Sequence, residues 1–116
     1  MVLTFGFPHE TWSRIVDVLA EVEEVERAVL FGSRALGSYS QTSDIDLALE
    51  GDRLNQTIVN NIAFALDDLM LPQRFDLVIK ARIDNPDLIQ HIEEFGQMIY
   101  PRENEAKSSI KERNWH

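Results

Sequence analysis

A glycine–serine pair and three aspartates are the residues of this chain whose types and spacing could do chemistry. Gly32 and Ser33 directly follow the apolar run 28–31, and Asp44 and Asp46 stand one residue apart further along. A turn that follows a strand and has free backbone N–H groups can bind a phosphate. Two carboxylates on one face of a strand can hold Mg²⁺. Together these features predict a protein that handles a nucleoside triphosphate.

The carboxylates would share one face because side chains alternate along a strand. Apolar residues alternate with Asp44 and Asp46 over 44–49, which predicts a strand with its other face toward the core. Asp76 lies on a second predicted strand, 75–79. If the two strands are neighbours, three carboxylates converge, as expected for a two-metal phosphoryl-transfer site. The Asp-Ile-Asp run by itself would favour an ordinary solvated strand face, and the preceding Gly-Ser turn favours the metal site.

The Gly-Ser turn has features that suit a phosphate. Gly32 lets the backbone bend and approach a ligand closely, and Ser33 adds a hydroxyl donor. Arg34 could contact phosphate or pair with a surface acid, and the residues leave both readings open. A lone Gly-Ser pair is usually an ordinary turn. Its spacing to Ser43 and to the two aspartates is what makes the signal specific.

Amphipathic periodicity predicts the elements that must position these residues. The fold class is α/β, of the α+β kind, with a mixed β-sheet of about four strands and helices packed on it. The short strand-to-strand connection through the polar loop 38–43 indicates an antiparallel or mixed sheet. The predicted elements are a helix at 9–23, strands at 28–31 and 44–49, a helical turn at 34–37, a helix at 54–69, a strand at 75–79, a helix between Asn85 and Gly96, and a strand at 98–100.

Composition narrows the class of protein. The chain has 116 residues, which fits one domain at 1–101 followed by a charged tail at 102–116, where Trp115 could dock on a partner. The net charge of -9 repels nucleic acid, so no direct nucleic-acid binding is expected. Cysteine is absent, which excludes disulfides and thiolate zinc sites and suits a reducing cytoplasm.

Neither a signal peptide nor a membrane helix is predicted, because no stretch approaches the roughly 20 apolar residues of a membrane span. The core of so short a chain is modest, so a partner or a homo-oligomer would be no surprise. The three histidines, His9, His91 and His116, are scattered along the chain. No catalytic role is predicted for them, and His91 is expected on a helix surface.

The run 31–47 resembles the signature of the DNA polymerase beta-like nucleotidyltransferase superfamily, a Gly-Ser pair followed by a strand with two aspartates. With Gly37 and Ser43 included, the pattern is most similar to the minimal nucleotidyltransferase (MNT) family. The resemblance extends over about 31–100 and implies the polymerase beta-like nucleotidyltransferase fold. One position departs from the family, since Leu36 stands where a basic residue is usual and removes a positive charge near the phosphates.

The resemblance also implies roles for the site residues. Asp44 and Asp46 would bind two Mg²⁺ ions, and Asp76 would hold the ion that activates an acceptor hydroxyl. Gly32 and Ser33 would cradle the β- and γ-phosphates of ATP, with Arg34 and Ser43 as further nucleotide contacts. The acceptor oxygen would then attack the α-phosphorus in line, and pyrophosphate would leave.

Small relatives of this family act with a second protein encoded nearby, so a helical HEPN-like or substrate-binding-domain partner is expected. Many such pairs resemble toxin–antitoxin systems in which AMP is transferred to a tyrosine of the toxin. The expected activity is thus Mg²⁺-dependent transfer of AMP from ATP to a hydroxyl. The alternatives are a partner-blocking module, a nucleotide-binding domain without transfer, a plain structural domain, and a transferase of antibiotic-type small molecules. The residues identify neither the acceptor, nor the preferred base, nor the stoichiometry with a partner.

Overall fold

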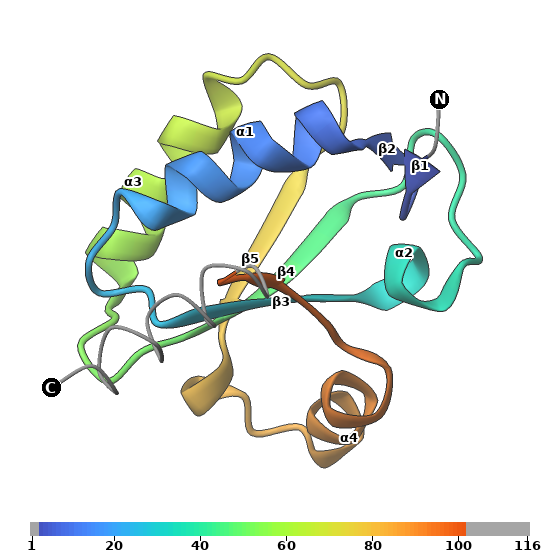
Figure 1. Ribbon diagram of the computed structural model, residues 1–116. Coiled ribbons are helices and arrows are strands. Elements are labelled where there is room, and N and C mark those ends of the chain that lie inside the picture. The colour runs from blue at the N-terminus through green and yellow to red at the C-terminus, as the bar shows by residue number, and fades with distance from the viewer. Residues whose placement is uncertain (1–2, 102–116) are drawn as a thin grey trace, which may run out of the picture.

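The protein is built on a four-stranded mixed sheet, seen in a computed structural model that describes residues 3–101. The predictions for the tail at 102–116, Trp115 included, lie outside the described residues. The strands are β3 (Arg27–Phe31), β4 (Ile45–Glu50), β5 (Phe75–Ile79) and β6 (Gln97–Tyr100), in the order β5-β4-β3-β6 (Figure 1). β4 runs parallel to β5, and β3 is antiparallel to β4 and β6. The predicted mixed sheet is therefore confirmed.

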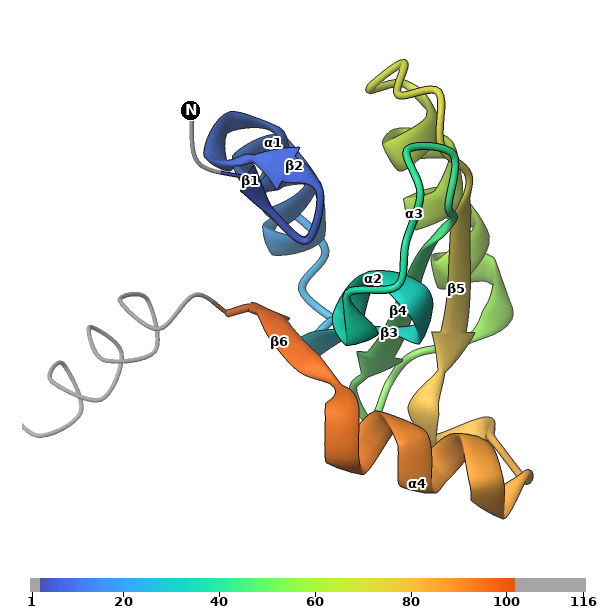
Figure 2. The same cartoon turned by 90° about the vertical axis from the view of Figure 1, so that its right-hand side faces the viewer.

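Helices cover both faces of this sheet. α1 (His9–Ala20) and α3 (Gln56–Asp67) lie on one face, and α4 (Pro86–Phe95) lies on the other (Figures 1 and 2). The larger core lies under α1 and α3 and includes Ile15, Leu19, Leu30, Leu47, Ile62 and Leu66. A smaller cluster under α4 contains Val29, Phe31, Ala48 and Ile92. Because Asp46 precedes Ala48 by two residues on β4, it belongs to the α4 face of the sheet.

Asparagine side chains start two of the helices. The Asn55 side chain accepts a hydrogen bond of 2.9 Å from the Ile58 N–H at the start of α3. Asn85 does the same for the Asp87 N–H at the start of α4, where Pro86 fills the first helical position. The predicted helices at 9–23 and 54–69 are both shorter in the structure: α1 ends at Ala20, and α3 covers Gln56–Asp67 because Asn55 is its N-cap.

An N-terminal hairpin, β1 (Leu3–Thr4) and β2 (Phe7–Pro8), was not predicted from the sequence. Strands of two residues are too short to show a periodicity. The hairpin is fastened to α1 by the Trp12 indole N–H, which donates to the Thr4 carbonyl at 2.6 Å. The rings of Phe5 and Phe7 meet the Trp12 ring edge-on.

Two further elements complete the described chain. α2 (Gly32–Leu36) begins directly after β3, and a 3-10 turn, η1 (Lys80–Arg82), follows β5. None of the helices within 3–101 has the length and apolar character needed to cross a bilayer.

Candidate active site

Two of the three aspartates are paired directly by strand register. β4 and β5 run side by side with Asp46 opposite Asp76, so both side chains project from the same face. Asp44 immediately precedes β4 and has the same parity as Asp46. The two strands are neighbours, which was the condition for the three carboxylates to converge, and the three acids lie where β4 and β5 begin. Asp46 is half-buried, whereas Asp44 and Asp76 are exposed.

Negative charge accumulates at Asp46. Burial raises the pKa of the Asp46 carboxyl above its ordinary value, and the charges of Asp76 and Asp44 and a hydrogen bond with Asp76 raise it further. Arg34 acts on this pKa in the opposite direction and does not cancel the effect. A half-buried carboxylate with two acidic neighbours is a place where a bound cation would relieve repulsion.

The donor chemistry fits Mg²⁺, which prefers carboxylate oxygens and substrate phosphates. In the positions that the side chains hold here, no group of three or more His, Asp or Glu within 3–101 is already arranged around a common metal position. Asp46 and Asp76 are the pair that the strands hold together. Exposed side chains such as Asp44 and Asp76 change rotamer within nanoseconds, so these two carboxylates can reorient toward a bound ion.

The Gly32-Ser33 turn, which was predicted to bind phosphate, lies next to these acids. Phe31, the last residue of β3, pairs with Asp46 in register, so α2 starts beside the carboxylates. Gly32 has a φ of +76°, a conformation that L side chains rarely adopt, and a Cβ there would overlap the Asp46 carboxylate. Ser33 follows, half-buried, in the first turn of α2, where backbone N–H groups have no partner within the helix.

Arg34, which was predicted as a phosphate contact, instead binds backbone carbonyls in the protein interior. Arg34 is 1% exposed, and its guanidinium donates to the Ser43 carbonyl at 3.0 Å and to the Phe5 carbonyl at 3.0 Å. It also stacks on the Phe7 ring at 4.3 Å and approaches the Tyr39 ring at 5.1 Å. Burial lowers the pKa of Arg34, with Tyr39 and Asp46 opposing the change. Because the N–H groups of this guanidinium donate to backbone carbonyls, the side chain stabilises the fold and is not available to a ligand.

Ser43 belongs to the same structural arrangement. Its hydroxyl accepts a hydrogen bond of 2.8 Å from the Ser40 N–H, and its carbonyl is the one bound by Arg34. Both groups therefore order the loop at 38–43 that leads into the aspartates. In this geometry Arg34 and Ser43 position the loop, and the predicted nucleotide contacts by these two residues gain no support from it.

His91 is a residue of the site that sequence reasoning missed. It was expected on a helix surface without a role, but it is half-buried and its Nε2 accepts the Gly32 N–H at 3.0 Å. A signal was present in the sequence, because His91 lies three residues after Leu88 and four before Phe95 on the apolar side of α4.

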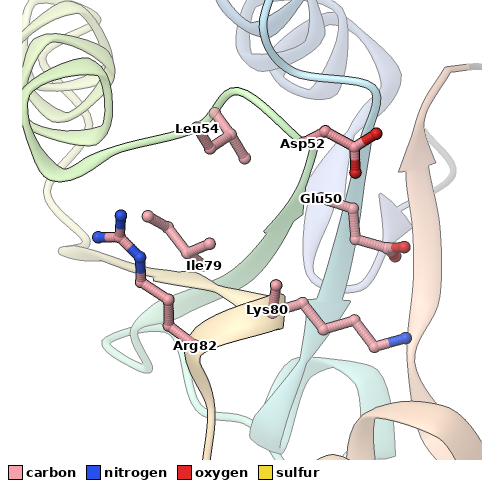
Figure 3. A pocket seen from close by; sticks show the side chains of 8 residues that line it. Glu50, Asp52, Leu54, Ile79, Lys80 and Arg82 are labelled. Carbon is pink, nitrogen blue, oxygen red and sulfur yellow. The ribbon is translucent and has the colours of Figure 1, made fainter.

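Two cavities in the described part of the chain are not lined by the acids. One of about 480 Å³ opens at the carboxyl ends of β4 and β5, and Figure 3 shows the side chains that line it. Another, of about 500 Å³, lies between the N-terminal hairpin and the loop at 38–43. The acids are at the opposite ends of β4 and β5 from the first cavity, and Asp44 and Asp76 are exposed, so the candidate site lies open at the ends of these strands. The first cavity is lined by Glu50, Asp52, Leu54, Ile79, Lys80 and Arg82, among others.

Comparisons with known proteins agree with this geometry. The family described as polymerase beta, nucleotidyltransferase matches residues 13–105. A relative from Methanocaldococcus jannaschii, named a candidate protein adenylyltransferase, is 33% identical over 85 residues, which are 72% of this chain and 83% of the relative.

Solved structures share the fold. A chain from a toxin–antitoxin crystal structure with AMP-PNP has a TM-score of 0.66 at 21% identity, covering 89% of this chain and 86% of that one. A second chain comes from a complex of a tri-AMPylated Shewanella oneidensis HEPN toxin with an MNT antitoxin. Its TM-score is 0.61 at 19% identity, and the match covers 84% of this chain and 76% of that one.

Proposed function

Because this chain belongs to the polymerase beta nucleotidyltransferase family and is thus a nucleotidyltransferase, we propose that it transfers AMP from ATP to a hydroxyl of a helical partner protein. The observation that carries the proposal is the acid pair Asp46 and Asp76, held by strand register against the Gly32 turn. Acidic ligands beside free backbone N–H groups are the two halves of a site for a metal-bound triphosphate.

Each group of the site has a role in this transfer. Asp44, Asp46 and Asp76 would hold Mg²⁺, which when bound supplies charge neutralisation for the phosphates and the attacking oxygen. The N–H groups of α2 that follow Gly32 and the Ser33 hydroxyl would bind phosphate oxygens, because the Gly32 N–H is already donated to His91 Nε2. A bond forms between the acceptor oxygen and the α-phosphorus, the bond from that phosphorus to the pyrophosphate oxygen breaks, and the hydroxyl proton is released. No protein nucleophile is needed, because positioning and charge supply the catalysis.

The relatives support the choice of ATP and of a protein acceptor. The Methanocaldococcus jannaschii relative is named for protein adenylylation, and chains of similar fold come from a structure with AMP-PNP and from a complex with an AMPylated HEPN toxin. By analogy we propose that the partner is HEPN-like, that the acceptor is a tyrosine hydroxyl of it, and that this chain is the antitoxin of the pair.

Intact-mass spectrometry tests the proposal. The protein is incubated with ATP, Mg²⁺ and the helical protein encoded beside it, and we expect the partner to gain the mass of AMP while pyrophosphate is released. Asp46→Asn should abolish the gain. Asp52→Asn is the matched control, because Asp52 is an exposed acid beyond the other end of β4.

The other outcomes have defined meanings. A stable complex without a mass gain would contradict protein adenylylation and favour the partner-blocking module. If the Asp46→Asn variant neutralises the partner as effectively as the wild type does, neutralisation does not depend on AMP transfer. That result would contradict the enzymatic account. Pyrophosphate release that needs a small hydroxylated compound and leaves the partner unmodified would favour a small-molecule acceptor.

A further inference from the structure

We propose that His91 is a positioning residue for the nucleotide turn, because its Nε2 fixes the peptide between Phe31 and Gly32. The inference rests on the proposed function in one respect, namely that this turn binds the triphosphate. It gives α4 a part in the site, although α4 contributes none of the acids.

The hydrogen bond from the Gly32 N–H to His91 Nε2 measures 3.0 Å and joins residues 59 positions apart. An acceptor nitrogen must carry a lone pair, so this contact requires the neutral imidazole with its proton on Nδ1. The bond ties the first residue of α2 to the middle of α4.

The imidazole ring is itself held in place. The Phe31 ring meets it edge-on with centroids 6.3 Å apart, and the Phe95 ring is tilted by 43° to it with centroids 5.6 Å apart. Ile92, the next residue of α4, is buried in the cluster under that helix. A ring with these neighbours has little rotamer freedom, so Nε2 has a defined position.

Gly32 needs such an anchor. Its φ of +76° lies in a region that glycine can leave at little cost, because glycine also populates other backbone conformations. On one side its backbone lies against the Asp46 carboxylate, and on the other its N–H is bound by His91. With both contacts the peptide has one orientation, and Ser33 follows in a defined place.

α2 cannot supply this order alone. It has five residues, and so short a helix does not offset the cost of its own nucleation. Its end is fixed by Gly37, in the left-handed conformation, and by the hydrogen bond from the Ser38 N–H to the Ser33 carbonyl at 3.0 Å. His91 fixes its beginning.

The test compares two variants that differ in one property. His91→Leu introduces an apolar side chain of similar size that has no hydrogen-bond acceptor. His91→Gln instead places an amide oxygen near the position of Nε2. Gln90→Leu is the control, since Gln90 is the exposed neighbour on α4. For each variant, the Kd of Mg²⁺–AMP-PNP, the KM and kcat of AMP transfer, the melting temperature and the amide resonance of Gly32 are measured.

We expect His91→Leu to raise the Kd and the KM for nucleotide roughly tenfold, the factor for one hydrogen bond of typical strength, with a smaller change in kcat. The Gly32 amide resonance should move at the same time. His91→Gln should restore the affinity to within about threefold, since an amide oxygen is also a competent acceptor. Gln90→Leu should behave as the wild type.

A folded His91→Leu variant with wild-type nucleotide affinity would overturn the proposal. If His91→Leu does not fold, the His91→Gln variant decides. A folded His91→Gln variant whose affinity for AMP-PNP is tenfold weaker would overturn the proposal. A His91→Gln variant that keeps the affinity and the position of the Gly32 amide resonance would support it. If the wild type binds AMP-PNP and transfers no AMP, the proposed function fails. The binding and resonance arms still decide the role of His91 in that case.

Discussion

Asp46 is the acid whose surroundings conflict most with its charge. We predict that Asp46→Asn raises the melting temperature in EDTA at neutral pH by a few degrees, because the charge of a half-buried group with two acidic neighbours is removed. Differential scanning calorimetry of the variant and the wild type measures the change. Asp52→Asn, which removes an exposed charge at the other end of β4 from Asp44, Asp46 and Asp76, should shift the melting temperature less.

The same pKa gives a pH dependence with a definite sign. The pKa of Asp46 is higher in the folded protein than in the unfolded chain, so the folded state binds the proton more tightly. The contribution of Asp46 to the free energy of unfolding therefore falls as pH rises from the ordinary carboxyl pKa of about 3.9 through the raised value. The advantage of Asp46→Asn should grow over that window and then level off. An advantage that is largest at the acid end of the window would contradict this account.

Two glycines with similar backbones separate strain from contact. Gly32→Ala and Gly37→Ala both place a side chain at positive φ, which costs about 1 kcal/mol or more. Only at position 32 does the new Cβ overlap Asp46, whereas it meets nothing within 4 Å at position 37. We expect both variants to unfold at lower urea concentration and only Gly32→Ala to lose nucleotide binding. Equal loss of binding in both variants would contradict a specific role for Gly32.

At the scale of elements, Arg34 holds the loop at 38–43 onto the N-terminal hairpin. Arg34→Met should destabilise the protein by about 2–4 kcal/mol, because the carbonyls of Phe5 and Ser43 lose their donor inside the protein. Urea unfolding followed by circular dichroism measures this change. The exposed Arg53→Met should stay within about 0.5 kcal/mol of the wild type. Near-equal stability of the two variants would contradict a structural role for Arg34.

The elements also mark what the sequence can and cannot predict. The mixed sheet followed from the alternation at 44–49 and the short connection before it, and the meeting of Asp46 with Asp76 required only that two predicted strands be neighbours. The hairpin at 3–8 could not be predicted, because two-residue strands carry no period and are fixed by contacts with Trp12.

The roles of Arg34 and His91 were not predictable for a related reason. Arg34 binds carbonyls of Phe5 and Ser43, and His91 reaches a residue 59 positions away, so both depend on tertiary contacts. A basic residue next to a Gly-Ser turn suggests a phosphate contact from its type alone. The structure shows that a guanidinium in that place can instead be a component of the protein interior.

At the scale of the whole molecule, ligand binding should appear as stability. The chain carries a net charge of -9, and three of its acids gather at one sheet edge. We expect Mg²⁺ and ATP together to raise the melting temperature more than the sum of each alone, because the ion is shared by carboxylates and phosphates. Differential scanning fluorimetry over a range of both ligands measures this coupling. Asp46→Asn should remove it, and additive shifts in the wild type would contradict a shared ion.

The placement of the acids on an open edge, with the cavity of about 480 Å³ at the other end of the same strands, has a consequence for fidelity. A transferase must keep water from competing with its acceptor, and enzymes commonly close a lid to do so. Asp44 and Asp76 are both exposed in the described part of the chain. The bound acceptor itself then has to exclude water from the site. An acceptor that fits poorly would leave the bound ATP accessible to water and therefore to hydrolysis. Discrimination between acceptors would accordingly be a matter of how completely each one shields the reaction from solvent.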